Sequence, residues 1–192
     1  GVEDKLGTQM RAVGEVMSIG KTYKEAFQKA IRSLETGRYG LGFAKDYNEK
    51  SKEELLRMLA TPSSDRHFIM YEALRKGATV DEIFDITKVK HYFVEQMKEL
   101  VEEEEAIAKS KGSLPSDEQL ISAKKNGFSD KYLSQILAIP EDDIRNKRIE
   151  LGIEEAWEGV HVSGTKDSAY YYSTYNAKDK NPVSEEKNKI MI

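Results

Sequence analysis

Three histidines and a run of four glutamates are the side chains of this sequence with the clearest capacity for chemistry. His67, His91 and His161 include no pair four residues apart, the spacing at which two imidazoles on one helix bind zinc. The glutamates at 102–105 lie in a helical pattern, where consecutive carboxylates point in different directions and do not converge on one ion. We interpret the histidines as surface or hydrogen-bonded residues and the glutamates as a solvated helix face. No residue is assigned as catalytic, cofactor-binding or metal-ligating.

Glycines and tyrosines offer two further possibilities. Gly14 and Gly20 lie near a helix start, where free backbone N–H groups can bind an anion. The stretch does not match the spacing of a phosphate-binding loop, so we favour a structural turn. The tyrosines at 170–172 and 175 have rings that can stack on bases, but few basic residues flank them. We interpret them as rings that are partly buried, with hydroxyls in water.

Composition narrows the class of protein. The 192 residues are 39% hydrophobic and 33% charged, which is typical of a helix-rich protein with a modest core. The net charge of −4 indicates neither a nucleic acid nor an anionic membrane as partner. The absence of cysteine excludes disulfides and thiolate zinc sites and is consistent with a reducing cytoplasm. No apolar run is long enough to span a bilayer. The glycine-rich start and the apolar end lead us to expect a segment of a larger fold.

The elements that must position these side chains are predicted to be helices. A hydroxyl residue followed three positions later by Glu or Gln marks a helix N-terminus, and this pattern occurs at Thr22, Thr79 and Ser116. Apolar residues at helical spacing follow each of them. We therefore predict a mainly α fold of short antiparallel helices. The predicted helices include residues 21–34, 91–109, 129–137 and 140–151. Small extended segments are predicted near the C-terminus, around Trp157 and residues 170–175.

Residues 116–152 imitate a DNA-binding helix-turn-helix, with two short helices joined at Ala138 and Ile139. This stretch has six basic and seven acidic side chains, which gives little of the counterion release that drives DNA binding. Three consecutive acids at 141–143 would also repel phosphates. A structural helix hairpin is therefore favoured. A helix-turn-helix regulator and a non-enzymatic helical scaffold stay open as alternatives.

Several motifs, in order along the chain, resemble a known enzyme family. Residues 8–22, TQMRAVGEVMSIGKT, resemble the segment that closes the first ATP-grasp unit of the carbamoyl-phosphate synthase large subunit. Residues 25–35 resemble the helix that follows it. The helical oligomerisation domain of the family is resembled by residues 64–66, 73–77, 80–87, 92–93, 127–130 and 144–148. Residues 170–175 and 189–192 resemble the start of the second ATP-grasp unit, whereas residues 160–166 are shorter than the family pattern and lack its cysteine and acid.

The resemblance implies three parts. Residues 1–38 would end the first, carboxyphosphate unit, residues 39–160 would form the helical oligomerisation domain, and residues 161–192 would be a linker with the first strand of the second, carbamoyl-phosphate unit. Met10, Gly14 and Met17 fall in the motif that packs near the passage for ammonia and carbamate in the family. The resemblance therefore implies a tunnel-lining or domain-interface position for them, with core packing as the competing interpretation.

The resemblance also implies a function. The family makes carbamoyl phosphate from bicarbonate, glutamine-derived ammonia and two ATP, with Mg²⁺ and K⁺, for arginine and pyrimidine biosynthesis in the cytoplasm. Its nucleotide and magnesium ligands lie outside the resembling segment, so we expect no cofactor here and no activity of this chain alone. The implied partners are the rest of the large subunit, the glutaminase small subunit and further copies of the chain, with no nucleic acid and no membrane.

Overall fold

The computed structural model describes residues 3–8, 15–43, 47–164 and 170–179. Within these ranges the chain forms eight helices and one two-stranded sheet, so the prediction of a mainly α fold is confirmed. None of the described helices combines the length and apolarity that crossing a membrane requires. The elements are α1 (Tyr23–Ser33), α2 (Lys52–Leu59), α3 (Arg66–Arg75), α4 (Val80–Thr87), α5 (His91–Ala108), α6 (Asp117–Lys125), α7 (Asp130–Leu137), α8 (Glu141–Glu150), β1 (Ala156–Gly159) and β2 (Tyr171–Thr174).

The helix starts follow from local hydrogen bonds. Ser51, Thr79 and Ser116 each accept a bond from the backbone three residues later, and the side chain there bonds back to the cap. These reciprocal bonds satisfy N–H groups that a helix start otherwise leaves unpaired. At α1, Thr22 accepts from the Glu25 backbone as predicted. The Glu25 carboxylate differs from the predicted box, because it accepts from the Lys21 N–H at 2.7 Å.

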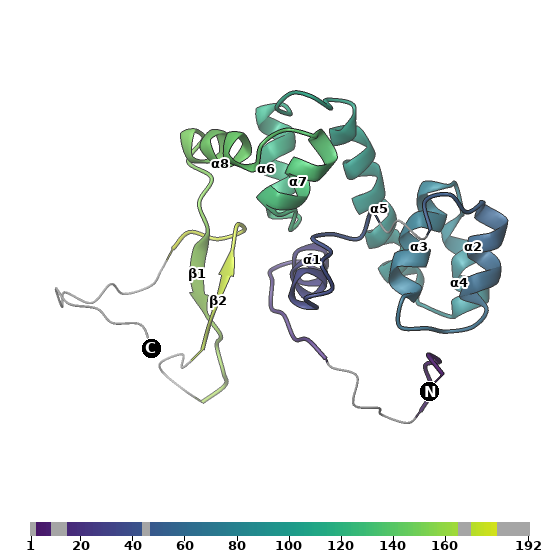
Figure 1. Cartoon of the computed structure of the whole chain (residues 1–192). Helices are drawn as coiled ribbons and strands as arrows, with labels where there is room; N and C mark the ends of the chain where they lie inside the picture. Colours follow the sequence, from purple (N-terminus) through teal and green to yellow (C-terminus); the bar gives the residue numbers. More distant parts are fainter. Residues whose placement is uncertain (1–2, 9–14, 44–46, 165–169, 180–192) are drawn as a thin grey trace.

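The helix α5 connects two groups of helices. Figure 1 shows α2, α3 and α4 gathered at one end of α5, and α6, α7 and α8 at the other end. The helices α3 and α4 pack on α5, while α7 packs on both α5 and α8. The helix α1 also contacts α5. The long helix therefore holds the two groups in one body.

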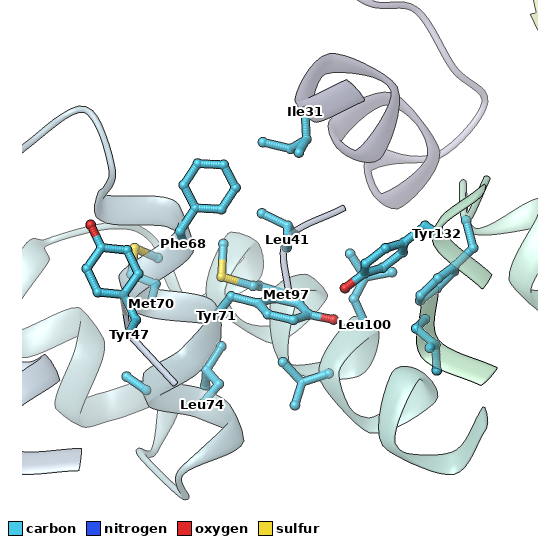
Figure 2. Close-up of a cluster of buried hydrophobic side chains, with 14 of the residues drawn as sticks. Ile31, Leu41, Tyr47, Phe68, Met70, Tyr71, Leu74, Met97, Leu100 and Tyr132 are labelled. Carbon is cyan, nitrogen blue, oxygen red and sulfur yellow. The ribbon is translucent and has the colours of Figure 1, made fainter. Parts of the chain in front are cut away.

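One hydrophobic core runs through this arrangement. On α5, Val94, Met97, Leu100, Val101 and Ile107 are all buried. Their spacing of three and four residues places them on one face of the helix. Figure 2 shows part of this core, in which side chains from α1, α3, α5 and α7 meet around one residue of the loop after α1; those labelled include Ile31, Leu41, Phe68, Tyr71, Met97 and Tyr132.

The extended segments predicted near the C-terminus form a hairpin. Strands β1 and β2 pair antiparallel, with Ala156 opposite Thr174 and Gly159 opposite Tyr171. The pairing continues one step further, because the Val160 N–H donates to the Tyr170 carbonyl at 2.8 Å. The prediction of extended structure is thus confirmed for residues 171–174 and for Trp157. The predicted strand at 189–192 lies outside the described residues.

Candidate functional site

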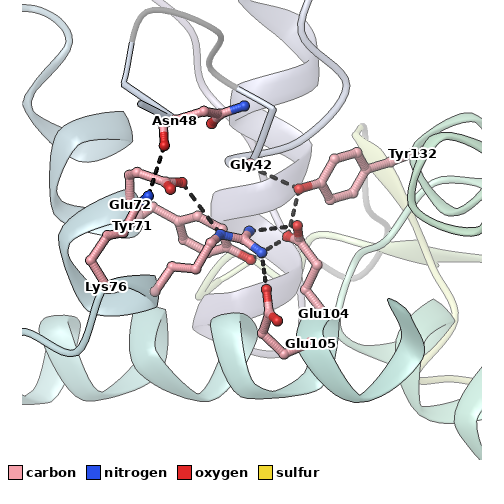
Figure 3. A network of polar contacts seen from close by, with 9 residues as sticks. Gly42, Asn48, Tyr71, Glu72, Lys76, Glu104, Glu105 and Tyr132 are labelled. Atoms are coloured by element: carbon pink, nitrogen blue, oxygen red, sulfur yellow. Dashed lines mark hydrogen bonds and ion pairs between the residues drawn. The ribbon is translucent and has the colours of Figure 1, made fainter. Parts of the chain in front are cut away.

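Glu104 of α5 lies inside the core, with 2% of its surface exposed. Its Oε2 atom accepts hydrogen bonds from the hydroxyls of Tyr71 at 2.5 Å and Tyr132 at 2.6 Å. Its Oε1 atom pairs with the guanidinium of Arg75 at 2.6 Å. Figure 3 shows the side chains of Tyr71, Glu104 and Tyr132, which come from α3, α5 and α7, pointing toward one another. We call Tyr71, Arg75, Glu104 and Tyr132 the polar core network.

The position of Glu104 corrects the prediction that residues 102–105 form a solvated face. The error has a physical cause, because Glu104 continues the buried stripe of α5, four residues after Leu100 and three before Ile107. Glu105 pairs with the same Arg75 but from an exposed position. Helical spacing was the sequence signal for a buried Glu104, and the run of four acids obscured it.

The charges and the burial of the polar core network suit a structural role. Burial raises the pKa of Tyr71 and of Tyr132 far above the usual value, so both hydroxyls keep their protons and donate to Glu104. Burial alone would lower the pKa of Arg75, but the nearby Glu104 charge reverses this and raises it. Tyr71, Tyr132 and Arg75 thus keep their protons and face Glu104 within the core. Such a network joins helices α3, α5 and α7.

The loop after α1 is bound to the same network. The Gly42 N–H donates to the Tyr132 hydroxyl at 2.8 Å. A Cβ atom on Gly40 would lie 2.3 Å from the Tyr132 ring. Only glycine allows the backbone to approach the ring this closely. The backbone at Gly40 and Gly42 is therefore part of the packing that holds Tyr132.

We predict that Gly40→Ala lowers the free energy of unfolding by about 1–3 kcal/mol, because the added methyl group overlaps the Tyr132 ring. Urea unfolding measures this loss. Gly7→Ala is the matched control, since nothing lies within 4 Å of a Cβ atom at Gly7. Equal midpoints for wild type and Gly40→Ala would show that the loop yields and that the close approach is not needed.

The structure places the predicted site residues as follows. Met17 is 89% exposed, and Met10 and Gly14 lie outside the described residues. A tunnel-lining or interface position for these three therefore stays a prediction. His91 bonds to Asp81 at 2.9 Å. Among the described residues, no group of three or more acidic, histidine or cysteine side chains is arranged to hold a metal ion.

Several charged side chains of α7 and α8 form ion pairs within the protein. Asp130 accepts from Lys124 at 2.7 Å and from Arg148 at 3.1 Å. Lys147 pairs with Asp117 at 3.2 Å. Basic side chains held by carboxylates give up the counterion release on which DNA affinity depends. The geometry therefore gives no support to a helix-turn-helix regulator.

Comparison with known proteins yields one family. Residues 15–152 match the model described as carbamoyl-phosphate synthetase large chain, oligomerisation domain. A carbamoyl phosphate synthase large chain, N-terminal section, from Methanopyrus kandleri is 40% identical over 88% of this chain and 33% of its own length. The large chain from Nostoc sp. is 37% identical over 100% of this chain, and that from Archaeoglobus fulgidus is 40% identical over 97%. This chain spans 18% of the length of each of these two relatives.

Proposed function

Because the chain belongs to the family of the carbamoyl-phosphate synthetase large-chain oligomerisation domain, we propose that it connects the two synthetase units of such a large chain. The observation that carries this proposal is the family match over residues 15–152, which includes every helix of the structure. The polar core network supports it, since it makes α3, α5 and α7 one rigid unit. A rigid unit is suited to holding two larger bodies at a set distance.

For the whole protein, the proposal extends to an ATP-dependent ligase. We propose that it makes carbamoyl phosphate from bicarbonate, ammonia and two ATP, with Mg²⁺ and K⁺. The ammonia would come from glutamine through a glutaminase small subunit, in the cytoplasm, for arginine and pyrimidine synthesis. Support comes from the resemblance of residues 8–22 to the end of the first ATP-grasp unit and of residues 170–175 to the start of the second, and from the names of the relatives. Nucleic acid and membrane have no part in this proposal.

Self-association is the property proposed for the chain itself. The family model that matches this chain is described as an oligomerisation domain. On the outside of α5, Tyr92 is 55% exposed and lies beside Phe93 and Tyr23, with ring centroids 5.4 and 6.1 Å away. Exposed aromatic rings are enriched where proteins associate. This aromatic surface supports association between copies of the chain.

Sedimentation velocity over a wide concentration range tests the proposal with the 192-residue chain. We expect reversible association, and we expect ATP turnover by the chain to stay at background. Tyr92→Ser should weaken association, whereas Ile149→Ser, at an exposed position on α8, should not. A strict monomer at high concentration would contradict the oligomerisation role. ATP turnover above background would contradict the role of an inactive connector.

A further inference from the structure

A cleft of about 210 Å³ opens where α1, the segment between α6 and α7, and β2 meet. Residues far apart in sequence line it, and four of them are basic. We call it the basic cleft, lined by Lys29, Arg32, Lys124, Lys131, Ser173 and Tyr175 among others. A single buried water molecule needs only about 10–15 Å³ of such space, so the cleft has room for a tetrahedral oxyanion.

Lys29 and Arg32 line the cleft, and neither is ion-paired with a carboxylate among the described residues. The Lys29 Nζ atom donates to the carbonyl oxygens of Ile19 at 2.7 Å and Ser173 at 2.6 Å. The Arg32 guanidinium donates to the Gly127 carbonyl at 2.5 Å. Among the described residues, neither side chain forms an ion pair within 4.0 Å. Burial lowers the pKa of both groups, since each charge has lost part of its water.

The carboxylates that line the cleft are mostly engaged elsewhere. Asp130 is held by Lys124 at 2.7 Å and by Arg148 at 3.1 Å. Glu25 accepts from the Lys21 N–H at 2.7 Å, which fixes it at the start of α1. Asp130 is therefore paired with two cations, whereas the Glu25 charge raises the pKa of Lys29 and of Arg32 without forming an ion pair with either among the described residues.

Two acidic residues remain at the rim. Glu141 lies 3.7 Å from Lys131, and both side chains are exposed. Glu155 is also exposed, and its charge raises the pKa of both Lys29 and Arg32 without reaching either as an ion pair. Glu25 and Glu155 are thus the groups that would compete with an anion for the two cations, and Glu155 is the one at the rim.

We propose that Lys29 and Arg32 bind an oxyanion in the basic cleft, either free phosphate or the phosphate group of a small metabolite. A guanidinium has five N–H donors in a planar fork, and Arg32 uses only one of its nitrogens within the described residues. Its remaining donors suit two oxygens of one phosphate. The ammonium of Lys29 has three donors, of which two are used. The cleft therefore offers unused donors from two half-buried charges.

Binding to the 192-residue chain can be measured by ³¹P line broadening at constant ionic strength. Inorganic phosphate is one arm and glycerol 3-phosphate is the other, with chloride as the balancing anion. We expect saturable binding, about tenfold weaker in Lys29→Gln and in Arg32→Gln, because each loses a charge-assisted hydrogen bond. Tighter binding of glycerol 3-phosphate would identify a metabolite, and equal or tighter binding of inorganic phosphate would identify the free ion.

Two further variants keep the test decisive. Lys88→Gln removes an exposed lysine just after the far helix α4 and should leave the affinity unchanged. Glu155→Gln removes the competing charge at the rim and should tighten binding several-fold, and it does so without disturbing Lys29 or Arg32. The absence of saturable binding in the wild type would overturn the proposal. So would equal weakening by Lys88→Gln, or an unchanged affinity in Glu155→Gln.

Discussion

Glu104→Ala is expected to lower the free energy of unfolding by about 3–5 kcal/mol. The change removes the one acceptor that Tyr71, Tyr132 and Arg75 share in the core. Arg75 then keeps only Glu72 and the exposed Glu105 as ion-pair partners among the described residues, and two buried hydroxyls lose their acceptor. Breaking a buried pair from one side is costly because the remaining charge stays desolvated. Urea unfolding at pH 7 measures the loss.

Two variants calibrate this result. Glu102→Ala lies on the same helix but removes a side chain that is 63% exposed and pairs with Lys98 at 3.8 Å. An exposed pair of this kind contributes no more than about 1 kcal/mol. Tyr71→Phe removes one of the two hydroxyl donors and should cost about 1–2 kcal/mol. If Glu104→Ala cost no more than Glu102→Ala, the polar core network would not be a source of stability.

Acidification from pH 7 to pH 4 is expected to destabilise the chain through His67 by about 3 kcal/mol. Burial lowers the pKa of His67 to about 4, from an ordinary value of 6.5. Its ring lies beside Phe68 and Phe27, with centroids 4.3 and 6.3 Å away, and its Nε2 atom has no hydrogen-bond partner in the described part of the chain. A proton therefore binds the unfolded chain more readily than the folded one. Each unit of pKa difference corresponds to about 1.4 kcal/mol.

The direction of the His67 pKa shift sets the pH range over which stability is lost. Above about pH 6.5 the imidazole is neutral in both states, so its contribution to stability is fully present. As the pH falls from 6.5 to 4, only the unfolded state gains the proton, and stability is lost steadily. Below pH 4 both states bind the proton, and His67 adds no further loss.

Urea unfolding of wild type and His67→Gln at pH 7, 5.5 and 4 separates His67 from the carboxylates that also titrate. The free energy difference between the two proteins should shift by about 3 kcal/mol in favour of the variant over this range. His161→Gln is the control, because His161 is exposed and should not change the pH profile. Parallel profiles for wild type and His67→Gln would contradict a depressed pKa at His67.

Much of the fold was predictable because its signals are local. The predicted boxes at Thr79 and Ser116 join groups three residues apart and both form in the structure, while Thr22 forms one of its two predicted bonds. The helix α5 begins at His91, as its apolar spacing predicted. The family was also within reach, because short motifs in order along the chain resemble it, and the match over residues 15–152 agrees.

The polar core network was not predictable from such signals. The partners of Glu104 on α3 and α7 lie 33 and 28 residues away in sequence. Composition alone makes a run of four acids a solvated face, and only the packing of α3 and α7 on α5 makes one of them the centre of the core. Gly40 shows the same limit, since its role depends on a ring 92 positions later in the chain.

The basic cleft also depends on contacts between residues far apart in the sequence. Lys29 and Arg32 are two ordinary cations of an amphipathic helix until carbonyls 144 and 95 residues away fold over them. By itself, the sequence determined the helices, their starts and the family, since periodicity and capping act within one or two turns. The tertiary structure alone decided which charges are buried and with whom, because burial depends on surfaces that meet only after the chain has folded.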